Sequence, residues 1–232
     1  MTDFNTHPVH GQETLIFDLD DTLYPLGAFL SHEKFISYLN EAAAKHLNIP
    51  LAEAEKLSER YLQDDIDVMD HWEREMNLPI SVVEDYIDAQ DISHVQACAA
   101  TQEFLARWAG RAVIFTNAHM SHSERFLEHL GLKDHIEHVS SNCVRQRRFK
   151  PDPAIYQELL EELDEKPENC IMFEDRHINL RPAYDLGMGT VLIHPEKEQQ
   201  NHEHVQLWYP DMKTWIENVK LQPAPTAERE TA

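Results

Sequence analysis

The chain has 232 residues, 42% of them hydrophobic, and its 42 acidic side chains outnumber 20 basic ones to give a net charge of −22. This length holds one large domain, or one domain with a smaller insertion. The negative charge repels nucleic acid and anionic lipid, so we expect neither nucleic acid nor a membrane as a partner. The segment 1–10 lacks the apolar stretch of a signal peptide, and no apolar run approaches the ~20 residues that cross a bilayer. We therefore expect a cytoplasmic protein.

Short apolar runs recur along the chain, and they are continuous rather than alternating, as in strands that helices cover on both faces. Helical patterns separate most of these runs, which predicts an α/β fold with a parallel sheet. The five runs are Thr14–Phe17, Arg111–Phe115, Ile136–Val139, Cys170–Phe173 and Thr190–Ile193. The three cysteines match no zinc motif, and Cys170 is predicted to be a small core residue.

The segment 26–91 breaks this alternation with three amphipathic helical patterns, and it is predicted to be an all-helical insertion after the first strand. Between residues 51 and 91 the chain has 13 acidic residues against 3 basic ones. Solvated helix faces explain this excess, and an acidic lid that disfavours polyanionic substrates is the alternative. The predicted domains are a Rossmann-like core of residues 1–25 and 92–221, a helical cap of residues 26–91 and a disordered tail of residues 222–232.

Two helices after the insertion have marked ends. Ser121 and Glu124 have the spacing of a capping box, and Gly131 is expected to end the same helix. Asp152 before Pro153 predicts the N-cap and first turn of a later helix.

The first strand leads directly into Asp18-Leu19-Asp20-Asp21-Thr22. In open α/β sheets, ligands bind at the carboxyl ends of the strands. Of two carboxylates gathered there, one can attack phosphorus, and the other can protonate the leaving oxygen and then activate water. A divalent cation is needed to offset the repulsion between these carboxylates and a phosphate, and Mg²⁺ prefers such hard oxygen ligands. Taken alone, the same string also occurs in acidic turns and helix caps.

Three later strings supply the remaining groups. Thr116 and Asn117 follow the second strand, where a hydroxyl and backbone N–H groups can hold phosphate oxygens. Lys150, before a predicted helix, offers an ammonium to the phosphoryl oxygens and to the attacking carboxylate. Glu174 and Asp175 follow another strand, where one acid can bind a metal directly and the other through water. Their alternative role is to favour a helix N-terminus through its dipole.

Other polar residues near these strings have ordinary structural explanations. Arg145, Arg147 and Arg148 are interpreted as a surface loop, with a wider positive field or a second substrate contact as the alternative. Asn179 is expected to hydrogen-bond to backbone and orient its loop. His177 is expected to be structural or exposed rather than catalytic.

Several histidine pairs have a spacing that a transition-metal site could use. They are His119 and His122, His135 and His138, and His202 and His204. Because fifteen histidines are scattered mostly over polar stretches, ordinary positions are favoured over a metal site.

The four strings, in this order and each after an apolar strand, resemble the signature motifs of the haloacid dehalogenase-like phosphatase superfamily. The resemblance covers about Glu13 to Ile216. The longer stretches Phe17–Pro25, Phe115–Ala118 and Lys150–Pro153 are similar to its pyrimidine 5′-nucleotidase-like branch. Membership implies a Rossmann-like core with a helical cap after the first motif.

The resemblance also implies roles for individual residues. Asp18 would be the nucleophile and Asp20 the general acid and base, with Thr116 and Lys150 on the phosphate. The dehalogenases of this superfamily lack the second acid of the first motif, so Asp20 favours a phosphatase.

For the cofactor, the resemblance implies Mg²⁺ held by Asp18, the backbone carbonyl of Asp20 and Asp175, with Glu174 in support. Glu174 stands where many nucleotidase relatives carry aspartate, which changes the reach of the carboxylate but not its charge.

The sequence therefore predicts a Mg²⁺-dependent phosphatase that hydrolyses a small phosphorylated metabolite through an aspartyl phosphate. A pyrimidine nucleoside 5′-monophosphate is the expected substrate, and the protein is expected to be a monomer or homodimer. A sugar-phosphate phosphatase or phosphomutase of the same superfamily is one alternative. A catalytically idle binding protein is the alternative from another class.

Overall fold

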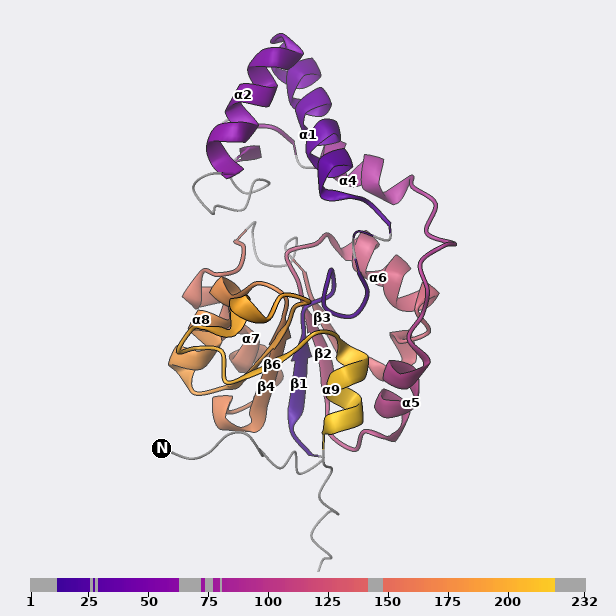
Figure 1. The fold of residues 1–232 in the computed structure, drawn as a ribbon, viewed down its shortest axis with the longest axis vertical. Coiled ribbons are helices and arrows are strands. Elements are labelled where there is room, and N and C mark those ends of the chain that lie inside the picture. The colour runs from indigo at the N-terminus through magenta and orange to yellow at the C-terminus, as the bar shows by residue number, and fades with distance from the viewer. Residues whose placement is uncertain are drawn as a thin grey trace, which may run out of the picture.

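The computed structural model describes residues 12–25, 27, 29–62, 72–73, 77–79, 81–141 and 148–219. Arg145, Arg147 and the predicted tail 222–232 lie outside these residues. Within them, six strands form one parallel sheet with helices on both faces, and a separate group of helices stands beyond one end of the sheet (Figure 1). The predicted α/β class is confirmed.

The sheet has the strand order β3-β2-β1-β4-β5-β6. The strands are β1 Thr14–Phe17, β2 Ala112–Phe115, β3 His138–Ser140, β4 Cys170–Glu174, β5 Gly189–Ile193 and β6 Leu207–Tyr209. All five predicted strands are present with small shifts at their ends, whereas β6 was not predicted. The chain passes from β1 to β2 on one side and later crosses to β4 on the other. The carboxyl end of β1 therefore lies at a point where the strand order reverses, which is the usual ligand site of such sheets.

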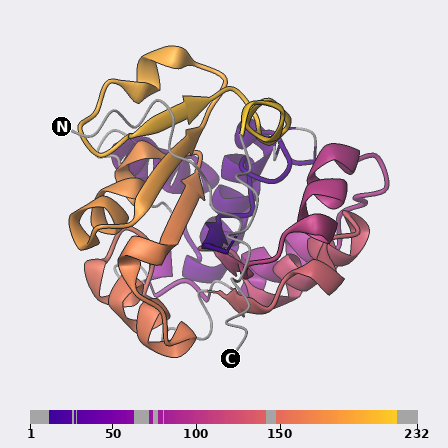
Figure 2. The same cartoon turned by 90° about the horizontal axis from the view of Figure 1, so that it is seen from below.

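Side chains of the central strand alternate between two apolar layers. Leu15 and Phe17 pack with α5, α6 and α9, while Ile16 packs with α7 and α8. Figure 2 shows these helices on the two sides of the sheet. Their bounds are α5 Ala99–Arg107, α6 Met120–His129, α7 Pro153–Leu163, α8 His177–Leu186 and α9 Met212–Asn218, with short 3₁₀ helices η3 Lys133–His135, η4 Pro167–Asn169 and η5 Lys197–Gln200. Both faces of the sheet are thus covered, as its continuous apolar strands require.

The predicted insertion is helical where the structure describes it. Its helices are α1 His32–Leu47, α2 Leu51–Leu62 and α4 Ser81–Asp88, at the top of Figure 1. They have their own apolar cluster, centred on Leu39, Ala43, Ala54, Trp72 and Leu78. This separate cluster supports the division into core and cap, whose exact boundaries stay a prediction. Among the described helices, none has the length and apolar character needed to span a membrane.

The capping box predicted at Ser121 is wrong. The N-cap of α6 is His119, two residues before the predicted one, and its ring accepts a hydrogen bond from the backbone N–H of Ser121 at 3.4 Å. The Ser121 hydroxyl instead donates to the Asp88 carboxylate of α4, so it links the core to the cap. The other two predicted helix ends are confirmed. Gly131 follows the end of α6 with a φ of +67°, and the Asp152 carboxylate caps the start of α7 by accepting from the Ala154 N–H at 3.0 Å.

Candidate active site

The loop after β1 places Asp18 and Asp20 at the carboxyl end of the sheet. The Asp18 N–H donates to the Phe173 carbonyl of β4 at 2.9 Å, which fixes Asp18 over the centre of the sheet. Asp21 then adopts a left-handed conformation with a φ of +56°, which aspartate tolerates better than most residues. The chain turns back on itself, and the Leu23 N–H donates to the Leu19 carbonyl at 2.9 Å.

Lys150 brings three of the predicted strings together. Its Nζ donates to Asp18 Oδ1 at 2.7 Å and to Glu174 Oε2 at 2.6 Å, and its side chain is only 1% exposed. The ammonium also lies 5.5 Å from the centre of the Phe115 ring. The Asn117 amide holds the backbone of Lys150 from both sides, since its Oδ1 accepts from the Lys150 N–H at 2.8 Å and its Nδ2 donates to the Lys150 carbonyl at 3.2 Å. The side chain of Asn117, predicted on the phosphate, therefore positions the lysine.

Glu174 is held by the protein on both carboxylate oxygens. Besides Lys150 on Oε2, its Oε1 accepts from Asn179 Nδ2 at 3.1 Å and from the Arg176 N–H at 3.3 Å. We expected Asn179 to bond to backbone, but its amide group donates to this carboxylate. Burial favours this partner, because a buried carboxylate needs donors to replace water.

The donor set fits a hard divalent cation. One carboxylate oxygen from each of Asp18, Glu174 and Asp175 lies within 4.8 Å of the other two. The pKa of Asp18 is raised by burial and, to a smaller extent, by the charge of Glu174, while Lys150 lowers it. The pKa of Asp175 is raised mainly by burial and further by the charges of Glu174 and Asp18. The Lys150 ammonium thus contacts two buried carboxylates, and the half-buried Asp175 lies beside them. Oxygen donors with an excess of negative charge are what Mg²⁺ binds in proteins.

Thr116 lies beside this group at the end of β2. Its N–H donates to the Ser140 carbonyl at 3.0 Å, and its Oγ1 accepts from the Ala118 N–H at 3.0 Å. The side chain is buried and lines the same cavity as Asp18 and Lys150. All the predicted site residues, including Asn117 and Glu174, therefore lie around one cavity.

His122 and Tyr24 belong to this site, although the sequence pattern did not predict their contacts. His122 Nε2 lies 2.9 Å from Asp20 Oδ1, and the Tyr24 hydroxyl donates to the same oxygen. Because a carboxylate only accepts, the first bond needs a proton on Nε2. Burial alone would raise the pKa of Asp20, but His122 lowers it below its usual value. Phe126 stacks on Tyr24 and lies against the His122 ring, with centroid distances of 4.3 and 4.4 Å.

Core and cap both line the cavity, whose volume is about 290 Å³. The cap side contributes Phe29, Leu30, Phe35, Glu84, Ile87 and Asp88. Its wall is therefore apolar and aromatic with two acids, opposite a floor of carboxylates and one lysine. Arg148, just upstream of Lys150, pairs instead with Glu158 at 2.5 Å and does not line the cavity.

Residues 12–184 match the family model of the haloacid dehalogenase-like hydrolases. The chain belongs to this family. The match contains β1, β2 and β4 and every side chain placed around the cavity above. The family is therefore shown, whereas the pyrimidine 5′-nucleotidase-like branch stays a prediction.

The chain is also similar to individual proteins and solved structures. The chain is 38% identical over 63 residues to the bifunctional epoxide hydrolase 2 of Mus musculus, a match to 27% of this chain and 11% of that protein. The matched part of the chain thus spans only about a tenth of the length of this relative. A haloacid dehalogenase phosphatase structure from Thermococcus onnurineus is 17% identical, covers 86% of this chain and 94% of its own, and has a TM-score of 0.61. Magnesium-bound YfnB from Bacillus subtilis is 13% identical, with 89% and 97% covered and a TM-score of 0.58.

Proposed function

We propose that this haloacid dehalogenase-like hydrolase is a phosphomonoesterase that transfers the phosphoryl group of a small substrate to Asp18. The observation that carries the proposal is the contact of the buried Asp18 carboxylate with the Lys150 ammonium at 2.7 Å, beside Thr116 and Asp20 on the floor of a cavity. Lys150 holds the carboxylate in place and offers positive charge to the phosphoryl oxygens. The Thr116 hydroxyl provides a further contact for these oxygens.

In the first step, an Asp18 oxygen bonds to phosphorus, the bond from phosphorus to the ester oxygen breaks, and Asp20 gives its proton to that oxygen. In the second step, Asp20 takes a proton from water, which attacks phosphorus and releases Asp18 and inorganic phosphate. The lowered pKa of Asp20 suits the second step. A bound phosphate raises the pKa of a neighbouring carboxyl group and so favours the protonated form that the first step needs.

Mg²⁺ fits the donor set, and the proposal assigns it to Asp18, Asp175 and the backbone carbonyl of Asp20. When bound, it neutralises charge on the transferring phosphoryl group. Both oxygens of Glu174 already accept hydrogen bonds from Lys150, Asn179 and the Arg176 backbone. We therefore assign Glu174 the role of orienting the lysine, with any contact to the ion through water. The magnesium-bound structure of YfnB supports the choice of metal.

The cavity supports a monophosphate with a flat, uncharged body as the substrate. Its volume of about 290 Å³ is near the small end of ligand pockets, which span about 300–1,000 Å³. Phe29, Phe35 and Ile87 offer apolar contacts, while Glu84 and Asp88 repel further phosphates. A nucleoside 5′-monophosphate meets these conditions, and the resemblance of Phe17–Pro25 to the nucleotidase branch favours a pyrimidine.

A phosphate-release screen tests this proposal. We expect Mg²⁺-dependent hydrolysis of p-nitrophenyl phosphate and, among metabolites, faster hydrolysis of UMP and CMP than of sugar phosphates or nucleoside triphosphates. Asp18→Asn should abolish turnover, whereas Asp134→Asn, a matched change of an exposed aspartate on η3, should not. Unchanged turnover in Asp18→Asn, or in EDTA, would overturn the assignment of nucleophile or metal. A preference for sugar phosphates would overturn the nucleotidase assignment alone.

A further inference from the structure

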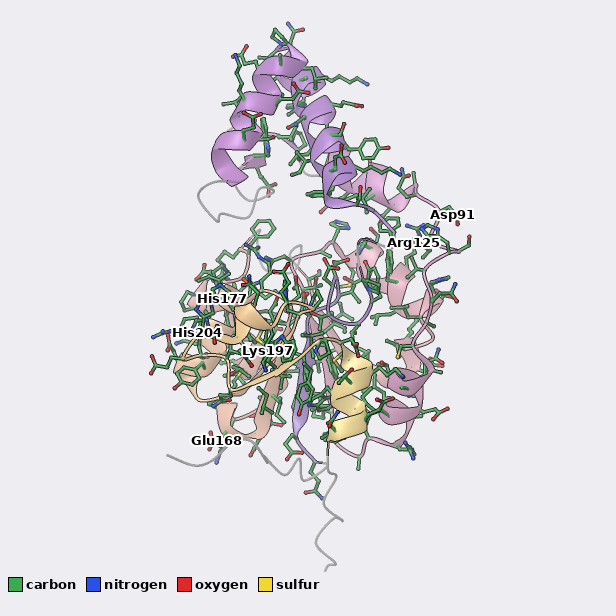
Figure 3. The ribbon with its side chains drawn as sticks, in the orientation of Figure 1. Asp91, Arg125, Glu168, His177, Lys197 and His204 are labelled. Carbon is green, nitrogen blue, oxygen red and sulfur yellow. The ribbon has the colours of Figure 1, made fainter. Side chains whose placement is uncertain are left out.

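One histidine comes together with a pair that follows it at a distance in the sequence, on the flank of the core and outside the cavity. His177 is the first residue of α8, and His202 and His204 lie in the loop before β6. One ring nitrogen from each lies within 4.8 Å of the other two. Figure 3 shows His177 and His204 next to each other on this flank. No spacing in the sequence groups His177 with the pair, because 25 positions separate it from His202.

The spacing of two of the nitrogens matches a metal site. His177 Nδ1 lies 3.3 Å from His204 Nε2. Four ligands in a tetrahedron around Zn²⁺, with Zn–N bonds of about 2.0–2.1 Å, place neighbouring nitrogens about 3.3–3.4 Å apart. His202 stacks on His177, with ring centroids 3.6 Å apart and an angle of 10° between the planes. A rotation of the His202 side chain would turn its nitrogen toward the other two.

Backbone hydrogen bonds fix the segments that carry these three histidines, so binding requires only side-chain rotation. His177 follows β4 after two residues and begins a helix. The His204 carbonyl accepts from the Thr190 hydroxyl of β5 at 2.8 Å, and the His202 carbonyl accepts from the Val205 N–H at 3.0 Å. Little conformational entropy is therefore lost when the imidazoles converge on one ion. A prepared site of this kind is expected to bind more tightly than scattered surface histidines.

The chemistry of the donors selects the class of metal. Imidazole suits zinc, copper, nickel and cobalt, whereas Mg²⁺ prefers oxygen ligands. A metal binds the neutral imidazole, so binding at this site should weaken as the pH falls. His177 and His202 are only half-buried, so water can occupy a fourth position. Without a metal, three imidazoles this close would repel one another when protonated.

We propose that His177, His202 and His204 form a binding site for a first-row transition-metal dication, with Zn²⁺ as the best fit. The bound ion would fasten the start of α8 to the loop before β6. Because α8 begins two residues after Asp175, the ion would also steady the turn that carries the acid pair of the catalytic cavity. This site is independent of the phosphatase proposal and does not require it.

The test measures metal binding rather than activity. The protein, produced without a histidine tag and stripped by a chelator, is titrated with Co²⁺ and Zn²⁺ in excess Mg²⁺, which occupies the carboxylate site. We expect one equivalent of Co²⁺ to give the intense visible bands of four-coordinate cobalt, Zn²⁺ to displace it, and Zn²⁺ to raise the melting temperature. His202→Gln should weaken Zn²⁺ binding by about 100-fold or more and remove the bands.

A matched control is His46→Gln, which changes an exposed histidine in the last turn of α1 and should bind metal as the unaltered protein does. Circular dichroism checks that each variant is folded, and His177→Gln serves as a second variant on a different element. The proposal is wrong if no equivalent of Co²⁺ or Zn²⁺ binds in excess Mg²⁺. It is also wrong if binding by folded His202→Gln and His177→Gln equals that of the unaltered protein.

Discussion

Replacing Lys150 by methionine removes the ammonium that contacts the buried Asp18 and Glu174 carboxylates, while nearly keeping the side-chain volume. Lys150 and Glu174 are each 1% exposed at the side chain and Asp18 is 9% exposed, with contacts of 2.7 Å to Asp18 and 2.6 Å to Glu174. Removing one partner of such a buried pair costs about 3–5 kcal/mol, because the remaining charges stay buried and unpaired. We expect Lys150→Met to lower the free energy of unfolding by this amount at neutral pH.

The loss should depend on pH in a defined direction. Burial alone would raise the pKa of Glu174, but Lys150 lowers it below its usual value. In the unaltered protein, Glu174 therefore contributes stability that is present above the unfolded pKa of about 4.3 and is lost as the pH falls through its lower folded pKa. Without the lysine, burial raises the pKa of Glu174, and the folded variant gains relative stability as this group takes up a proton. The difference between the two proteins should shrink as the pH falls.

Urea unfolding in EDTA, followed by circular dichroism at several pH values, measures both effects. Lys213→Met is a matched control, because Lys213 pairs with Glu217 at 3.1 Å on the surface, with side chains 64% and 57% exposed. Solvent-exposed pairs contribute little. If Lys150→Met were no more destabilising than Lys213→Met, or if its effect grew as the pH fell, our explanation of the site's electrostatics would be refuted.

Three further predictions follow from single contacts. His122→Ala should lower kcat/KM for UMP by about tenfold or more and that for p-nitrophenyl phosphate less. The parameter kcat/KM reports the first transfer, in which the nitrophenolate leaves without a proton from Asp20. An equal fall for the two substrates would argue against the positioning of Asp20. Asp152→Ala should lower the free energy of unfolding, measured in urea, by about 0.5–2 kcal/mol because the α7 cap is lost, whereas Asp152→Asn should be close to the unaltered protein. An unchanged free energy of unfolding in Asp152→Ala would contradict the role of Asp152 as a cap. Burial raises the pKa of Cys170 to about 12, so iodoacetamide should label Cys98 but not Cys170 in the folded protein. Peptide mass spectrometry measures the labelling, and rapid labelling of Cys170 would contradict its burial.

The sheet was predictable because its strands are buried on both faces. The runs at Thr14–Phe17 and Cys170–Phe173 are continuous and apolar, a pattern that solvated strands do not show. Strand β6, Leu207–Tyr209, was missed because it is three residues long, half-buried and at the edge of the sheet. A run this short has no periodicity that separates it from a loop.

The grouping of the candidate site residues was predictable because topology alone brings them together. Asp18, Thr116 and Glu174 each end or follow a strand of one parallel sheet, so adjacent strands deliver them to one edge. The contacts of His122 and Tyr24 with Asp20 depend instead on a tight turn and on the orientation of α6, which short motifs do not encode. The spacing of His119 and His122 had offered a metal pair only as the less favoured alternative, and the structure shows His122 bonded to the Asp20 carboxylate.

The identity of the nucleophile is the central claim, and trapping of the phosphorylated enzyme tests it most directly. The protein is mixed with substrate and Mg²⁺, quenched during turnover and treated with borohydride, which reduces an acyl phosphate to an alcohol. Peptide mass spectrometry should then find homoserine at position 18 and nowhere else, and none when substrate is omitted. An enzyme that turns over substrate while Asp18 stays unreduced, or while Asp20 or Asp175 is reduced in its place, would contradict the account.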